Sequence, residues 1–121
     1  WLAVPPRLYG VQAEGSAAIA NAFHSGGEKI IPVSASTLAD SISVDLPRDG
    51  IRAVRAARQT GGTYLLVSDQ EILAAIPELG KCGIFAEPAG STAYAGMLKA
   101  LHQGLVQATP GTRWTSCTTR P

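Results

Sequence analysis

Short apolar runs alternate with amphipathic helical patterns along this chain, and the alternation limits the folds that it can adopt. Apolar runs at residues 8–12 and 63–67 are bounded by Gly or Pro and have the length of a buried strand. A helical pattern follows each run, at residues 17–24 and from residue 68 onward. Strands that alternate with helices are typical of parallel βαβ layers. We therefore predict an α/β fold with three layers, helix–sheet–helix, around a small and mainly parallel sheet.

Helix start signals support this assignment. Ser16 is the expected N-cap of the first helix, and Ser68 with Glu71 forms a capping box at the start of a later one. Pro77 is expected to kink or shorten that later helix, whereas Pro88 suits the first turn of the last and longest helix. The side chains expected to face the core are large apolar residues at helical spacing: Ile72, Leu73, Ile76 and Leu79, and then Tyr94, Met97, Leu98 and Leu101.

Two further segments are weaker strand candidates. Residues 29–33 form an apolar run that Pro32 restricts to a sheet edge, and residues 82–86 are expected to be a short buried strand or extended segment. Residues 34–48 have neither a helical nor a strand period. A long irregular connection inside a compact chain is more often functional than idle, so this segment becomes a site candidate.

The charge balance argues against several classes of function. The net charge of the 121 residues is +1 and no block of like charges occurs, so we expect no nucleic-acid partner and no membrane-binding surface. No apolar run approaches the roughly 18 residues needed to span a bilayer. Charged residues make up only 16% of the chain, below the usual quarter or so, which suggests that it buries more surface than a lone domain would.

No metal site or complete catalytic constellation is present in the sequence. Cys82 and Cys117 have no CxxC spacing and no nearby His, so we predict no metal and two reduced thiols in a cytoplasmic protein. His24 and His102 fall on predicted helices far apart in the chain. Neither a nucleophile elbow nor a glycine-rich phosphate loop occurs.

Two loops have the character of a binding site. Residues 36–43 and 86–91 are rich in small side chains and carry one carboxylate each, Asp40 and Glu87. Ligands of α/β sheets bind outside the carboxyl ends of the strands, where a strand-to-helix turn such as the second loop lies. The alternative interpretation is structural, with Glu87 stabilised at a helix N-terminus and Asp40 serving as a turn residue.

Motifs in and around these loops carry a resemblance to a known family. Arg-Leu-Tyr-Gly-Val-Gln-Ala-Glu-Gly-Ser stands at residues 7–16, Ser-Thr-Leu-Ala-Asp-Ser-Ile-Ser-Val at 36–44, Val-Ser-Asp-Gln-Glu-Ile-Leu at 67–73 and Gly-Ile-Phe-Ala-Glu-Pro-Ala-Gly at 83–90. In this order and spacing, over residues 1–106, the chain resembles the threonine synthases and related pyridoxal-phosphate enzymes of the tryptophan synthase β-like group, which have the type II fold.

The resemblance implies a pyridoxal 5'-phosphate cofactor held between two domains and a small amino-acid substrate. Ala39, Asp40 and Ser41 would flank the cofactor, and Glu87 would lie near its ring hydroxyl or nitrogen. Ala89, in the same Glu-Pro-Ala-Gly turn, would be a further cofactor-binding residue. Similar enzymes convert O-phospho-L-homoserine to threonine, or deaminate threonine or serine.

The resemblance covers only the C-terminal part of the large domain of such an enzyme. The family's Schiff-base lysine, its substrate-binding Ser/Asn loop and its phosphate-binding glycine loop belong upstream of the matched residues, and the lysines Lys29, Lys81 and Lys99 do not occupy the lysine's motif. We therefore expect the chain alone to be catalytically inactive and to bind no cofactor covalently. Residues 107–121 depart from the family, as a shifted reading frame or a truncated gene would produce, and are expected to be a poorly ordered tail with a candidate strand at 112–115.

Three alternatives remain open at this stage. The chain could be a non-catalytic α/β module that self-associates as a homodimer through exposed sheet edges. It could be a segment of a longer protein whose activity the missing remainder restores. It could also be a piece of a threonine or serine dehydratase rather than of a threonine synthase.

Overall fold

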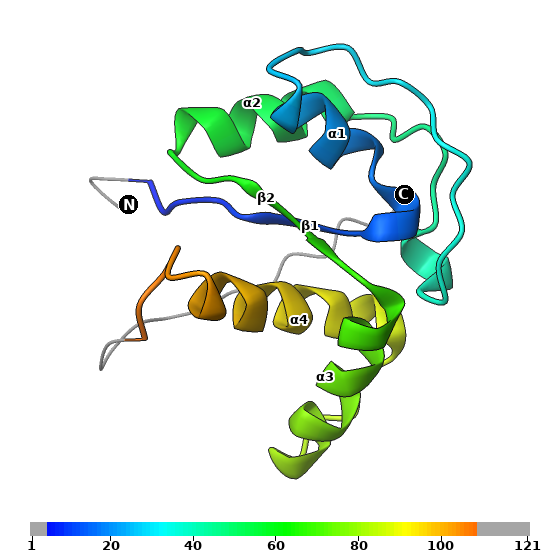
Figure 1. The fold of residues 1–121 in the computed structure, drawn as a ribbon, viewed down its shortest axis with the longest axis vertical. Helices are drawn as coiled ribbons and strands as arrows, with labels where there is room; N and C mark the ends of the chain where they lie inside the picture. The colour runs from blue at the N-terminus through cyan, green and yellow to red at the C-terminus, as the bar shows by residue number, and fades with distance from the viewer. Residues whose placement is uncertain (1–4, 109–121) are drawn as a thin grey trace.

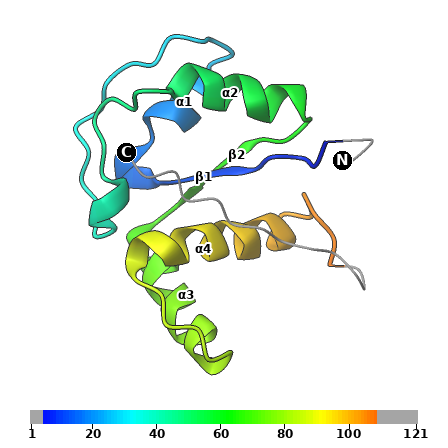
Figure 2. The ribbon, with the colours of Figure 1, turned by 180° about the vertical axis from the view of Figure 1, so that it is seen from behind.

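Helices pack against both faces of a two-stranded parallel sheet (Figures 1 and 2). The structure is a computed structural model that describes residues 5–108. Strand β1 (Gly10–Ala13) pairs with β2 (Tyr64–Val67), in a register that runs from Gly10 opposite Tyr64 to Ala13 opposite Val67. The predicted three-layer α/β fold with a small parallel sheet is therefore confirmed.

The two helical layers come from separate parts of the chain. Helices α1 (Ala18–His24) and α2 (Gly50–Gln59) lie on one side of the sheet. Helix α4 (Pro88–His102) lies on the other side, and α3 (Asp69–Lys81) packs against α4 near the end of β2. No helix in the described range is long and apolar enough to cross a membrane.

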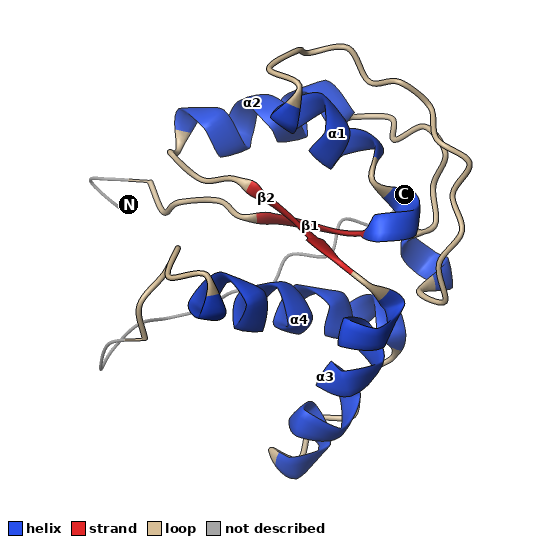
Figure 3. Cartoon of the chain, in the orientation of Figure 1, coloured by secondary structure: helices blue, strands red, loops and turns tan. Residues whose placement is uncertain are grey.

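Two strand predictions are wrong. The structure gives residues 29–33 and 82–86 no strand, and Figure 3 draws both segments as loop or helix end. The apolar side chains in them are not buried, since Ile31 is 67% exposed and Phe85 is 99% exposed. A strand needs a ladder of backbone hydrogen bonds, and within residues 5–108 neither segment joins the sheet of β1 and β2; the Val33 amide makes a single backbone bond, to the Asp45 carbonyl at 3.0 Å.

The start of α1 also differs from the prediction. Ser16 is not its N-cap but the last residue of a short 3-10 turn, Glu14–Ser16. The N-cap is Ala17, which has no side chain able to bond the helix. The side-chain oxygen of Gln12 takes this role instead, accepting hydrogen bonds from the amides of Ile19 at 3.0 Å and Ala20 at 2.8 Å.

The start of α3 follows the prediction. The Ser68 hydroxyl accepts a hydrogen bond from the Glu71 amide at 3.2 Å, and the Glu71 carboxylate accepts one from the Ser68 amide at 2.7 Å. The expected shortening at Pro77 does not occur, because the helix continues past it to Lys81. Pro88 stands in the first turn of α4, as predicted.

Most of the buried apolar residues are alanines, and on α4 the buried face differs from the predicted one. The large apolar residues expected to face the core, from Tyr94 to Leu101, are only half-buried. The buried face consists of small residues: Ala89, Ser91, Thr92, Ala95, Gly96 and Ala100. Gly96 shows the cause, since a Cβ at this position would lie 2.3 Å from a Val11 methyl group of β1. Such a close approach of helix to sheet leaves room only for small residues.

Candidate functional site

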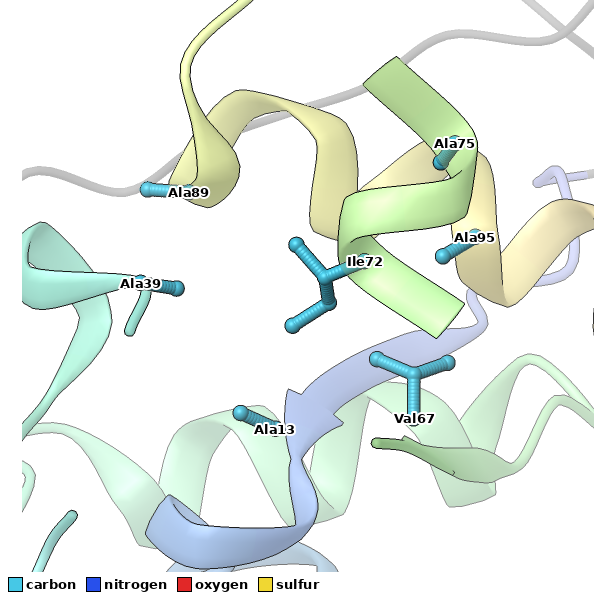
Figure 4. Close-up of a cluster of buried hydrophobic side chains, with 7 residues drawn as sticks. All are labelled: Ala13, Ala39, Val67, Ile72, Ala75, Ala89 and Ala95. Atoms are coloured by element: carbon cyan, nitrogen blue, oxygen red, sulfur yellow. The ribbon is translucent and has the colours of Figure 1, made fainter. Parts of the chain in front are cut away.

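The two predicted loops meet at the carboxyl ends of both strands. Ala39 and Ala89 belong to one buried cluster with Ala13 and Val67, which are the last residues of β1 and β2 (Figure 4). Ala39 is 0% exposed and Ala89 is 7% exposed. This is the edge of a parallel sheet at which ligands of α/β proteins bind.

The polar residues of the two loops lie above this buried base. Asp40 and Ser41 stand on a 3-10 turn, Asp40–Ile42, and both side chains are exposed. The Ser41 hydroxyl donates to Oε1 of Glu87 at 3.5 Å, so it links the turn to the residue just before α4. The structure thus brings all five residues of the predicted site into one region: Ala39, Asp40, Ser41, Glu87 and Ala89.

Asp69 is a residue of this region that the sequence did not single out for the site. Its carboxylate accepts a hydrogen bond from the Thr37 hydroxyl and another from the Leu38 amide at 3.1 Å. The Thr37 oxygen in turn accepts from the Ala39 amide at 3.3 Å. Asp69 therefore bonds the loop at the two residues directly before Ala39.

Ser16 fixes the other end of the same loop. It is 2% exposed, and its oxygen accepts from the Val44 amide at 3.1 Å. Its hydroxyl lies 3.1 Å from the carbonyl oxygen of Ile42 and 3.3 Å from that of Val44, to either of which it can donate. Its neighbour Gly15 accepts from the Ser36 amide at 2.9 Å, and a Cβ on Gly15 would lie only 1.8 Å from the Ser36 carbonyl oxygen.

No signal in the sequence separates these two anchors from ordinary cap residues. Ser and Asp before a helix are typical N-terminal residues, and this is the interpretation that the pattern favours for both. Their actual partners lie far away in the chain, 28 positions for Ser16 with Val44 and 32 positions for Asp69 with Thr37.

Glu71 links α4 to the first turn of α3, the turn in which Asp69 also lies. Its Oε2 accepts from Lys99 of α4 at 3.0 Å as well as from the Ser68 amide. Burial by itself would raise the pKa of Glu71, but the hydrogen bonds from the Ser68 backbone and the Lys99 ammonium outweigh it and hold the pKa below the usual value. The carboxylate is therefore ionised at neutral pH and keeps its bond to Lys99.

The polar side chains of this site, Asp40, Ser41 and Glu87, suit the ring of an aromatic cofactor rather than a phosphate. A hydroxyl and two carboxylates can bind a ring N–H or hydroxyl above the small apolar base of Ala39 and Ala89, whereas carboxylates repel an anion. No lysine stands at this site among residues 5–108: Lys99 pairs with Glu71, Lys81 pairs with Glu78 at 2.7 Å, and Lys29 lies in the segment after α1. The same range contains no group of three or more residues able to hold a metal ion.

Comparison with known proteins gives the same family. A family described as "Pyridoxal-phosphate dependent enzyme" matches residues 2–110. Threonine synthase of Methanosarcina acetivorans is 39% identical over 103 residues, and that of Mycobacterium tuberculosis is 40% identical over 103 residues. Each match covers 84% of this chain and 25% or 26% of the relative, so the chain spans about a quarter of the length of the curated relatives it matches.

Solved structures share the fold. The threonine deaminase of T.th. superposes with a TM-score of 0.60 at 23% identity, covering 75% of this chain and 33% of that one. Maize serine racemase superposes with a TM-score of 0.62 at 22% identity, covering 80% of this chain and 31% of that one. At these identities the likeness extends to the fold alone.

Proposed function

This chain belongs to the pyridoxal-phosphate-dependent enzyme family, and on that premise we propose that it supplies the ring side of the cofactor site of a threonine synthase. The observation that carries the proposal is the meeting of the two loops, with the Ser41 hydroxyl 3.5 Å from Glu87 above the buried Ala39 and Ala89. The residues concerned are those for which the resemblance implied contact with the cofactor.

Each residue of the site has a role that its chemistry allows. Pyridoxal 5'-phosphate, when bound, supplies an electron sink for bonds at the α-carbon of a small amino acid. The Glu87 carboxylate would accept a hydrogen bond from the ring, and Ser41 would orient that carboxylate. Ala39 and Ala89 would leave room for the ring because their side chains are small. Asp40, exposed on the same turn, adds a second carboxylate at the rim.

The substrate that we propose is O-phospho-L-homoserine, converted to threonine. Support comes from threonine synthases, which are 36–40% identical to this chain over 103 residues. The phosphate anchor and the lysine that holds the cofactor would come from residues outside this chain. The chain by itself would therefore be inactive. A cytoplasmic location belongs to the proposal, because the Cys82 thiol is free and exposed and extracellular cysteines are commonly paired.

A chimera tests the proposal directly. The 103 matched residues of the Methanosarcina acetivorans threonine synthase would be replaced by the corresponding residues of this chain. We expect the purified chimera to form threonine from O-phospho-L-homoserine. Glu87→Ala should lower its turnover by about tenfold or more, the cost of one hydrogen bond to a charged group. Glu28→Ala, which removes an exposed carboxylate paired with Arg55 on the other side of the sheet, is the matched control.

Other results of the same assay point to other functions. A chimera that deaminates threonine or serine but forms no threonine would favour a dehydratase. A folded chimera without any activity, or one in which Glu87→Ala and Glu28→Ala act alike, would contradict the proposed site.

The isolated chain gives a simpler prediction. Mixed with pyridoxal 5'-phosphate and then treated with borohydride, the 121-residue chain should yield no stoichiometric covalent adduct in its intact mass. The reason is that Lys81 and Lys99 are held in ion pairs, while Lys29 lies beside residues 46–52 at the start of α2 and not at the site. A stoichiometric adduct on one lysine would show that the chain carries its own cofactor-binding amine.

A further inference from the structure

We propose that Asp69 is a positioning residue, which sets the loop of Ala39 to Ser41 against Glu87. This inference rests on the proposed function, since it concerns the same site. Asp69 is the first residue of α3 and directly follows the capping residue Ser68. Its carboxylate bonds Thr37 and Leu38, so it would act through the loop that it holds.

The carboxylate of Asp69 is free to hold the loop because other groups cap the helix. The Ser68 hydroxyl and the Glu71 carboxylate already form both bonds of the capping box. The two oxygens of Asp69 bind different donors of the loop, Oδ1 the Thr37 hydroxyl and Oδ2 the Leu38 amide. A two-point contact of this kind fixes both the position and the direction of the backbone that enters Ala39.

The loop has two further anchors, Gly15 on Ser36 and Ser16 on Val44, but Asp69 bonds the residues directly before Ala39. Between α1 and α2 its only regular element among the described residues is the 3-10 turn Asp40–Ile42, so no helix or strand ladder holds Thr37 and Leu38. The Thr37 oxygen also accepts from the Ala39 amide at 3.3 Å, so Asp69 is connected through Thr37 to Ala39. Ala39 is the buried residue beside Ala89, and Ser41 reaches Glu87 one turn later.

The same turn of α3 also holds the other side of the site. Glu71 binds Lys99 in α4, the helix that begins directly after Glu87. Asp69 therefore bonds the loop and Glu71 bonds α4, so both are attached to one short segment, Ser68–Glu71. We infer that this segment sets the spacing between Ser41 and Glu87.

Amide hydrogen exchange measured by NMR on the 121-residue chain tests the role of Asp69. Asp69→Asn replaces two charged acceptor oxygens by one neutral carbonyl oxygen and one NH₂ donor, so neither of the two bonds keeps a charged acceptor. We expect the Leu38 and Ala39 amides to exchange about tenfold faster or more, the factor for one lost hydrogen bond to a charged group. Val67 in β2 should keep its rate within about twofold, because strand pairing is untouched.

Three further variants complete the series. Thr37→Val removes the hydroxyl that bonds Oδ1 of Asp69, and it also removes the acceptor of the Ala39 amide itself. The Leu38 amide, which Asp69 accepts from, is therefore the readout: it should exchange faster in Thr37→Val, whereas Thr37→Ser keeps a hydroxyl and should restore slow exchange. Asp49→Asn is the matched control, since Asp49 precedes α2 and its carboxylate pairs with the exposed Arg52 at 3.8 Å. Unchanged Leu38 and Ala39 rates in Asp69→Asn, or a rise that is as large at Val67, would overturn the proposal. If Asp69→Asn does not fold, the Thr37 pair decides the same question.

A ring probe separates this inference from the proposed function. Pyridoxine, which has the ring but neither phosphate nor aldehyde, should shift the amide signals of Ser41 and Glu87 in the unmodified chain and in Asp49→Asn, and much less in Asp69→Asn. If pyridoxine shifts these signals equally in Asp69→Asn, the positioning role is wrong and the proposed site stands. If it shifts nothing in any variant while the exchange pattern is as expected, Asp69 holds the loop and the proposed cofactor site is wrong.

Discussion

At the scale of single residues, the buried hydroxyl of Ser16 lies within hydrogen-bond distance of three backbone groups. It binds the amide of Val44 and lies within reach of two carbonyl oxygens, so it closes the end of the loop that carries the site. Ser16→Ala leaves these backbone groups without their partner. The cost of an unsatisfied buried polar group is about 1–3 kcal/mol.

We therefore predict that Ser16→Ala lowers the free energy of unfolding by about 1–3 kcal/mol in urea denaturation. Ser25→Ala is the control, because Ser25 is exposed and its hydroxyl bonds near neighbours in the chain, the Ala22 carbonyl and the Gly27 amide. It should change stability by less than about 0.5 kcal/mol. Equal losses in the two variants would mean that the contacts of Ser16 contribute nothing of their own.

Residue types near a site could be predicted from the sequence, but their partners could not. Asp40 and Glu87 stand out because they are carboxylates in loops of small residues, and the structure brings these loops together. Ser16 and Asp69 look like helix caps, and each bonds a segment that the chain places about thirty positions away. Only the tertiary fold decides between a local and a distant acceptor.

At the scale of elements, the contact between α4 and β1 depends on one missing side chain. Gly96 and Gly90 lie in the same helix, yet a Cβ at Gly96 would meet Val11 at 2.3 Å, while a Cβ at Gly90 would meet only the Ala86 Cβ at 3.8 Å. Alanine at either position changes helix propensity in the same way, but only at Gly96 does it also clash with the sheet, so comparing the two variants isolates the effect of packing.

We predict opposite effects for the two alanine variants. Gly96→Ala should destabilise the chain by about 1–3 kcal/mol because α4 must move off the sheet. Gly90→Ala should stabilise it by about 0.4–1 kcal/mol because alanine restricts the unfolded chain and the space is open. Thermal unfolding followed by circular dichroism measures both, and a Gly96→Ala chain as stable as Gly90→Ala would contradict the close approach described above.

The errors in the predicted elements have a common physical cause. Apolar periodicity shows which side chains avoid water, and it does not show what covers them. Residues 82–86 have the composition of a strand, but Phe85 is 99% exposed and no strand lies beside it in the described range. The predicted face of α4 is wrong where the helix meets the sheet, since close packing there selects glycine and alanine over larger residues, although the half-buried Tyr94 does pack against the core cluster.

At the scale of the whole molecule, apolar surface remains uncovered. Among the described residues each strand of the sheet has a single partner, and Leu73, Ile84 and Phe85 are all at least 52% exposed. Exposed strand edges and large apolar side chains favour association with another chain. This is the property on which the interpretation as a self-associating module depends.

We predict that the 121-residue chain self-associates and that Phe85→Ser weakens the association by about ten- to a hundredfold, as expected for one aromatic side chain that is no longer buried. Sedimentation equilibrium at several concentrations measures the effect. Ile31→Ser, at a 67% exposed position in the long segment between α1 and α2, is the control. A similar change in both variants would show that the association does not involve the segment before α4.

The pairing of Gly10 with Tyr64 also sets the order in which the molecule can form. A ribosome that adds about 5–20 residues each second needs roughly 3–11 s to proceed from the first partner to the second. During that interval β1 waits without its neighbour while α1 and then α2 are synthesised. The nascent chain is therefore most exposed to misfolding partners before β2 emerges, and synonymous codons that slow translation across residues 14–63 would lengthen this interval.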